Sequence, residues 1–199
     1  GKPPMVSQFA PISILTTVPM VVVARADGRF ADMKAVLAEA RAKPGTISFG
    51  HAGNGTTNHI AILRLQVNDK VQFNIIPYKG SAPGLADLVG GQLDLYMDQL
   101  TTSLPQIKAG KLKALAVMSP DRIAQLPDVP SLKDIGSVPF DGGTTAGLLA
   151  RADTPAALLD TLNGACVAAL RDEEVARKLA DLGAIVDRKS ARLNSSHVK

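Results

Sequence analysis

Short apolar runs alternate with helical patterns over the first 118 residues of the chain. Each run spans only a few residues, and the segments between them repeat apolar residues every three or four positions, as amphipathic helices do. Strands joined by helices of about ten residues form βαβ units with right-handed crossovers, which build a mostly parallel sheet. We therefore predict an α/β fold, with strands at 20–24, 46–49, 72–76, 92–97 and 112–118.

The same periodicity predicts the helices. Helical spacing marks segments near 33–40, 60–67, 85–89 and 100–109, and the last of these closes at Gly110. Beyond a connection at 119–155 that is rich in proline and glycine, two more helices are expected, at 155–171 and between Asp172 and Gly183. A final strand is expected at 184–186.

Composition excludes several classes of function. The 22 Lys and Arg against 18 Asp and Glu leave a net charge of +4, without a run or stripe of basic residues that could follow a nucleic-acid backbone. Five Phe, two Tyr and no Trp are too few for a base-stacking platform. One cysteine, Cys166, excludes an internal disulfide, and no apolar run approaches the ~20 residues of a membrane span. We predict no nucleic-acid partner and no direct membrane insertion.

The opening Gly-Lys-Pro-Pro has neither an initiating Met nor an apolar leader. It suggests a processed chain or a fragment.

A glycine-rich turn is the most informative local feature. It leaves the strand near Phe49, passes Gly53 and Gly55, and enters a helix that Thr56 is placed to cap. Free N–H groups and a partial positive charge make a helix N-terminus suitable for an anion, and glycines let the backbone approach a ligand closely. The alternative is a plain turn whose glycines serve only geometry. The spacing is neither that of a P-loop nor that of a dinucleotide fingerprint.

Two further polar turns follow successive strands. Lys79 and Ser81 come after the strand ending near Ile76, and Asp98 ends the next strand. Ligands of open α/β sheets bind outside the carboxyl ends of the strands, so the three turns are expected to share one edge.

Other candidates point away from chemistry. His51 and His59 lie eight residues apart without a third ligand, so we predict no metal site and expect His59 to be a hydrogen-bonded packing residue. Cys166 lies on an apolar stripe and is expected in the core. No nucleophile motif or acid–base pair is evident, so we predict no catalytic residues, no cofactor and no enzyme activity.

Six segments in this order resemble the Bug family of periplasmic substrate-binding proteins, which serve tripartite tricarboxylate transporters. They are Lys43-Pro-Gly-Thr-Ile-Ser-Phe-Gly50, Gly53-Asn-Gly-Thr-Thr-Asn-His59, Ile76-Pro-Tyr-Lys-Gly-Ser-Ala-Pro83, Leu88-Val-Gly-Gly-Gln-Leu-Asp94, Leu104-Pro-Gln-Ile-Lys-Ala-Gly-Lys-Leu-Lys-Ala-Leu-Ala-Val117 and Leu126-Pro-Asp-Val-Pro-Ser-Leu132. The resemblance runs from about Phe9 to Val186.

The resemblance implies a two-lobed, type II periplasmic-binding-protein fold that closes on a small carboxylate, held largely by backbone amides. It further implies a periplasmic location and delivery of the ligand to the membrane components of the transporter. The ligand-binding positions it implies are Gly53, Asn54, Gly55, Thr56, Thr57, Tyr78, Lys79, Gly80, Ser81 and Asp98.

The chain departs from the family pattern in three places. The family's opening lobe has no counterpart, so the resemblance implies a hinge-crossing segment at 1–20, a complete Rossmann-like lobe at 21–118 and the returning part of the other lobe at 119–187. Thr144-Thr145-Ala146 stands where the family usually carries an aromatic residue, and Arg151 replaces a usual proline. Residues 188–199 continue nothing in the family and are expected to be a foreign tail.

Three functions stay open on the sequence: a solute-binding protein for a di- or tricarboxylate or an amino or hydroxy acid, an effector-binding sensor domain of the same fold, and an enzyme that uses the anion site.

Overall fold

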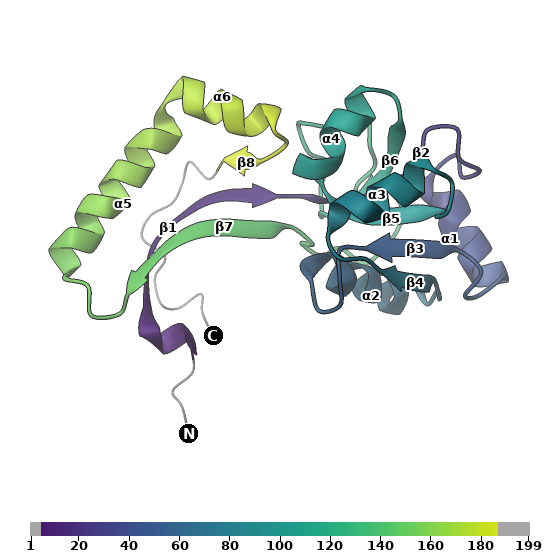
Figure 1. Cartoon of the computed structure of the whole chain (residues 1–199), viewed down its shortest axis with the longest axis horizontal. Coiled ribbons are helices and arrows are strands. Elements are labelled where there is room, and N and C mark those ends of the chain that lie inside the picture. The colour runs from purple at the N-terminus through teal and green to yellow at the C-terminus, as the bar shows by residue number, and fades with distance from the viewer. Residues whose placement is uncertain (1–4, 187–199) are drawn as a thin grey trace. The chain divides into compact units, whose positions relative to one another are not determined.

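The computed structural model describes residues 5–186 of the chain (Figure 1). These residues form two compact units. The larger is continuous, from Pro19 to Thr144, and the smaller combines residues 5–18 with residues 145–186. The expected tail at 188–199 lies outside the described residues. None of the helices within residues 5–186 is long and apolar enough to cross a membrane.

A five-stranded sheet in the order β4-β3-β5-β2-β6 forms the centre of the larger unit. Its three internal strands are β3 (Ser48–His51), β5 (Leu95–Gln99) and β2 (Met20–Arg25). The edge strands are β4 (Asn74–Pro77) and β6 (Leu112–Val117). All five predicted strands exist, although β3, β4 and β5 begin two or three residues later than predicted.

The expectation of a mostly parallel sheet is confirmed, because β4, β3, β5 and β6 run in the same direction and only β2 is reversed. Strand β3 pairs in parallel with β4 and β5, but β2 runs antiparallel to both of its neighbours, β5 and β6. The βαβ rule applies only where a helix carries the chain back across the sheet. The chain enters β2 from the smaller unit rather than through a crossover helix. The apolar residues of β2 do not indicate in which direction the strand runs.

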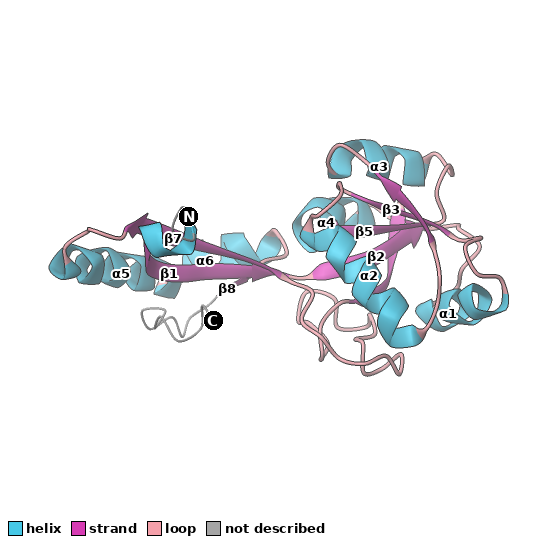
Figure 2. Cartoon of the chain, turned by 90° about the horizontal axis from the view of Figure 1, so that it is seen from below, coloured by secondary structure: helices cyan, strands magenta, loops and turns pink. Residues whose placement is uncertain are grey.

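Helices cover both faces of this sheet, as Figure 2 shows. Alternate residues of β2 pack on opposite faces of the sheet. Met20 and Val22 pack with α1 (Met33–Ala42) and α2 (Thr57–Asp69), whereas Val21 packs on the other face. That second face is covered by α3 (Ser81–Val89) and α4 (Leu100–Lys108). Because both faces are buried, the strands are apolar throughout rather than alternating.

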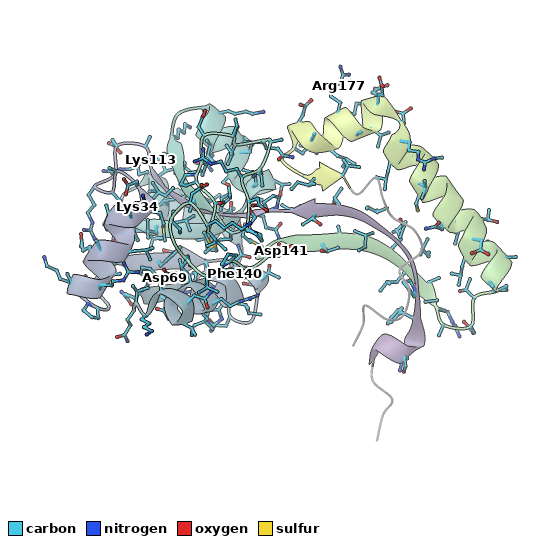
Figure 3. All side chains as sticks on the ribbon, turned by 180° about the vertical axis from the view of Figure 1, so that it is seen from behind. Lys34, Asp69, Lys113, Phe140, Asp141 and Arg177 are labelled. Carbon is cyan, nitrogen blue, oxygen red and sulfur yellow. The ribbon has the colours of Figure 1, made fainter. Side chains whose placement is uncertain are left out.

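Residues 119–144 belong to the larger unit, whereas the sequence predicted that this unit ends at residue 118. Leu132 and Phe140 are buried in the core against α1 and α2. Ser137 donates a 2.6 Å hydrogen bond to the buried carboxylate of Asp69, which is labelled with Phe140 in Figure 3. The unit therefore extends to Thr144, because these few apolar anchors hold a segment that otherwise has the composition of a loop.

The smaller unit holds a three-stranded sheet in the order β7-β1-β8. Its elements are a short 3-10 helix (Met5–Gln8), β1 (Phe9–Val18), β7 (Thr144–Arg151), α5 (Ala156–Arg171), α6 (Glu173–Asp181) and β8 (Ile185–Val186). The predictions of α5, α6 and β8 are confirmed, including Asp172 as the cap that accepts from the N–H groups of Glu174 and Val175. Strands β1 and β7 were not predicted.

This smaller unit buries little apolar surface. In α5 only Leu159 and Leu170 are buried, while Leu158 on the same predicted stripe is 49% exposed. Cys166 is half-buried rather than enclosed in a core. Nearly all of β7 is exposed as well.

Candidate functional site

Three helix N-termini meet at one edge of the sheet in the larger unit. Strands β4, β3 and β5 lie side by side and run in the same direction, and each leads directly into a helix: β3 into α2, β4 into α3 and β5 into α4. The prediction that the three polar turns share one edge is confirmed. We call the three turns, residues 51–57, 77–81 and 98–102, the carboxyl edge.

Hydrogen bonds join the three turns to one another. The N–H of Tyr78 donates to the carbonyl of His51 at 2.9 Å, and the N–H of Gly80 donates to that of Ala52 at 3.1 Å. The hydroxyl of Ser81 donates to Asp98 Oδ1 at 2.6 Å, which links the second turn to the third. The carboxyl edge is thus one connected structure rather than three independent loops.

The first turn needs its glycines. Gly53 has a φ of +136° and Gly55 a φ of +77°, in the region that other residues rarely adopt. Thr56 then caps α2: its hydroxyl donates to the carbonyl of Gly53 at 2.7 Å and accepts from the N–H of His59. The prediction of Thr56 as the cap is confirmed.

Two histidines contact the backbone of this turn, and the sequence did not predict these contacts. The N–H of Gly55 donates to His59 Nδ1 at 3.2 Å. His51 Nδ1 lies 2.9 Å from the carbonyl oxygen of Gly53 and 3.2 Å from its nitrogen. The Gly55 amide, which the resemblance implies as a ligand contact, is therefore engaged within the protein. His59 is a hydrogen-bonded packing residue, as predicted.

The first amides of α2 and α3 are better placed to receive an anion. The leading N–H groups of any α-helix have no acceptor within the helix. In α2 these belong to Thr57 and Asn58, because the third, of His59, is taken by the Thr56 hydroxyl. In α3 they belong to Ser81 and Ala82, since Pro83 has no N–H and the cap residue, Gly80, has no side chain.

Side chains of the first turn differ in their surroundings. Asn54 and Thr57 are exposed. The Thr57 hydroxyl lies 3.1 Å from that of Thr144, to which the side-chain amide of Gln99 also donates at 3.2 Å. Asn58 is buried and donates to the carbonyl of Met97 at 2.9 Å. Thr57 is thus the side chain of this turn that combines exposure with a hydroxyl donor.

Tyr78 and Lys79 in the second turn have separate roles. The Tyr78 hydroxyl donates to Asp87 at 2.8 Å, and burial together with this carboxylate raises its pKa to about 12. Lys79 is exposed and forms no ion pair within residues 5–186. Its ammonium group is therefore available to a ligand carboxylate.

Asp98 is not exposed at the edge, contrary to the expectation that its carboxylate faces a ligand. The side chain is fully buried, and its two oxygens accept hydrogen bonds from the hydroxyls of Ser81 and Thr102. Burial raises the pKa of Asp98, while these hydrogen bonds act in the opposite direction. Asp98 therefore ties the start of α3 to the start of α4, and it is a positioning residue in this structure.

Sequence reasoning missed Thr102 and the contacts that Thr144 makes with Thr57 and Gln99. Thr102 lies four positions after Asp98, one helical turn, so its contact had a local signal. Thr144 lies 87 positions from Thr57, and no spacing rule connects them. Within the part of the chain that the structure describes, the carboxyl edge offers uncharged donors and the ammonium group of Lys79, which suits anion binding better than proton transfer or nucleophilic attack.

Solved structures with the same fold bind carboxylates or serve as periplasmic binding proteins. The periplasmic binding protein BugD is 35% identical, with a TM-score of 0.79 over 92% of this chain and 62% of its own. MatC from Rhodopseudomonas palustris, solved with bound malate, is 32% identical, with a TM-score of 0.78 over 91% and 62%. R. palustris Rpa4515, solved with adipate, is 26% identical, with a TM-score of 0.83 over 92% and 62%. These similarities confirm the expected type II periplasmic-binding-protein fold.

Sequence comparison agrees. The UPF0065 protein in the tcbD-tcbE intergenic region of Pseudomonas sp. (strain P51) is 37% identical over 88% of this chain and 52% of that protein. The chain spans about half the length of the curated relatives that it matches. The model of the tripartite tricarboxylate transporter family receptor matches residues 4–194. The chain belongs to this receptor family, and its similarity to BugT and BugD confirms the resemblance to the Bug proteins.

Proposed function

We propose that this chain contributes to an extracytoplasmic solute-binding protein that captures a small carboxylate for a tripartite tricarboxylate transporter. Its ligand-binding positions are those of the carboxyl edge: Gly53, Asn54, Gly55, Thr56, Thr57, Tyr78, Lys79, Gly80 and Ser81, with Asp98 behind them. The periplasmic location and the membrane partners belong to the same proposal and rest on membership of the family.

One observation carries the proposal: three helices begin at the same edge, and their turns are bonded into one structure. Each helix N-terminus carries about half a positive charge together with free N–H groups. Lys79 adds a full positive charge at this edge, and Asp98, the acid of the third turn, is buried and hydrogen-bonded. Malate and adipate in the two R. palustris proteins are anions of the chemistry that such an edge would accept.

We also propose that the larger unit, residues 19–144, is one complete lobe, and that residues 5–18 and 145–186 belong to a second lobe. The larger unit closes its own core on both faces of its sheet. The smaller unit leaves apolar residues such as Leu149, 59% exposed, without cover from the described residues. A single lobe supplies only part of the ligand contacts, so this chain alone is expected to bind dicarboxylates weakly, well above micromolar.

The proposal is tested by titrating the chain with malate and adipate and following backbone amide signals by NMR. Signals from the carboxyl edge should shift at millimolar ligand, and the neutral diamide of adipic acid should leave them unchanged. Gly55→Val should abolish the shifts, because the branched side chain enters space that is open at Gly55. Thr57→Ala should weaken binding about fivefold, the equivalent of one hydroxyl bond of about 1 kcal/mol.

Gly45→Val is the matched control. Gly45 also has a positive φ, +74°, and open space around its missing side chain, but it precedes β3 at the opposite end of that strand. Both valine variants therefore carry the same backbone strain, and only Gly55→Val lies at the proposed site. Dicarboxylate shifts that survive in a folded Gly55→Val variant would place the ligand elsewhere.

A further inference from the structure

His51 and His59 form a stacked pair directly behind the glycine turn. Their ring centroids are 4.5 Å apart and the rings are nearly parallel, at 8°. His51 ends β3 and is fully buried, whereas His59 lies in the first turn of α2 and is half-buried. The pair therefore joins the strand before the turn to the helix after it.

The contacts of each ring indicate a neutral imidazole. His51 Nδ1 contacts both polar atoms of Gly53: it lies 2.9 Å from the carbonyl oxygen, to which it can donate, and 3.2 Å from the N–H, from which it can accept, according to its tautomer. Within residues 5–186, Nε2 of His51 has no hydrogen-bond partner. A second proton on the ring would bury an uncompensated charge, so the ring is neutral. Burial and the neighbouring His59 accordingly lower the pKa of His51.

His59 acts as an acceptor in this turn. Its Nδ1 accepts from the Gly55 N–H at 3.2 Å, so Nδ1 must carry the lone pair and the ring must be neutral. Protonation would place an N–H opposite the N–H of Gly55, and that hydrogen bond would break. The charged ring would also stack on the buried ring of His51.

The other titratable groups near the pair are hydrogen-bonded, packed on an aromatic ring or exposed. On the elements packed against the end of β3, Tyr78 donates to Asp87 and Asp98 accepts from Ser81 and Thr102. Tyr96 of β5 donates to the carbonyl of Gly80, Arg64 of α2 lies over the ring of Phe140, and Lys79 is exposed. Apart from burial, the neighbouring His59 ring lowers the pKa of His51, whereas the contact with the Gly53 carbonyl acts in the opposite direction.

We infer that His59 is a positioning residue for the carboxyl edge: its neutral ring, stacked on His51, holds the Gly55 amide and so fixes the turn from which α2 begins. Loss of the Nδ1 acceptor releases this turn and weakens ligand binding. The part of the inference that concerns the ligand rests on the proposed function, and the part that concerns the turn does not.

The first measurement compares the Gly55 amide signal of the labelled parent with that of two variants at one pH. In His59→Asn the signal should stay at its bonded position, because the amide oxygen of Asn can replace Nδ1 as acceptor. In His59→Phe, which keeps a stackable ring and loses the acceptor, the signal should lie at its unbonded position.

Gln66→Leu is the control on the same helix. The Gln66 side chain accepts from the backbone N–H of Phe73 at 2.7 Å, at the far end of α2. Its loss removes a similar acceptor and should leave the Gly55 signal unchanged.

The second measurement titrates the parent and the same variants with malate at one pH. His59→Asn should bind malate as tightly as the parent, and His59→Phe should bind it about fivefold more weakly. A Gly55 signal that has the same position in His59→Phe as in the parent overturns the inference, as does a signal displaced equally in both variants, or equal malate affinity of His59→Phe and the parent. If malate does not bind while the Gly55 signal is displaced in His59→Phe and restored in His59→Asn, the proposed function fails and the positioning role stands.

Discussion

Gly84 in α3 should be a position where Gly→Ala destabilises the protein, although the same change normally stabilises a helix by about 1 kcal/mol. A methyl group at Gly84 would lie 2.1 Å from Cε2 and 2.7 Å from Cζ of Tyr96. The same ring also lies close to β3, where a Cβ at Gly50 would lie 2.6 Å from its Cδ2 atom, and the Tyr96 side chain is fully buried. Tyr96 thus occupies the side-chain space of two glycines at once.

The magnitude follows from these opposing effects. Overpacking of a buried site costs about 1–3 kcal/mol, and the close approach of the added methyl group to three atoms of the buried Tyr96 side chain favours the upper end of that range. After the gain of about 1 kcal/mol in helix propensity, Gly84→Ala should lower the free energy of unfolding by about 2 kcal/mol. Because the Tyr96 hydroxyl donates to the carbonyl of Gly80, the second turn of the carboxyl edge should shift as well.

Urea unfolding followed by tyrosine fluorescence measures this loss in the larger unit alone. The chain has no Trp, and both of its tyrosines, Tyr78 and Tyr96, lie in that unit. The control is Gly164→Ala in the middle of α5, where the added methyl group meets nothing within 4 Å. It should leave the tyrosine transition unchanged and raise the hydrogen-exchange protection of α5. A Gly84→Ala variant as stable as the parent would refute the packing argument.

Two other predictions concern ionisation and proteolysis. Burial raises the pKa of Tyr78 to about 12 and that of Tyr96 above its ordinary value, so native protein should show no phenolate absorbance at the usual pH near 10, whereas urea-unfolded protein should. Since the folded state holds these protons more tightly, stability should fall as the pH rises from 10 toward 12; a native titration centred near pH 10 would contradict the burial of both rings. Limited proteolysis should leave a protected fragment that extends to about Thr144, because Leu132 and Phe140 anchor residues 119–144 in the core; mass spectrometry showing a fragment that ends near Met118 would contradict that packing.

The sequence by itself determined the elements of the larger unit and the edge at which they expose polar turns. Apolar runs and helical spacing depend on local burial, and the glycines, the Thr56 cap and the Asp172 cap act within a few residues of their own positions. The order of strand and helix then places the turns after β3, β4 and β5 together, because parallel strands end at one edge of a sheet.

Only the tertiary structure decided the direction of β2, the burial of Asp98 and the engagement of the Gly55 amide. Each depends on contacts between residues that no pattern along the chain predicts. The apolar residues of β2 are compatible with either strand direction, and the burial of Asp98 depends on its hydrogen bonds with Ser81 and Thr102. Strands β1 and β7 were not predicted from the sequence, for a related reason. Their burial is slight within the described residues, so the alternation that buried faces impose on a sequence is weak there.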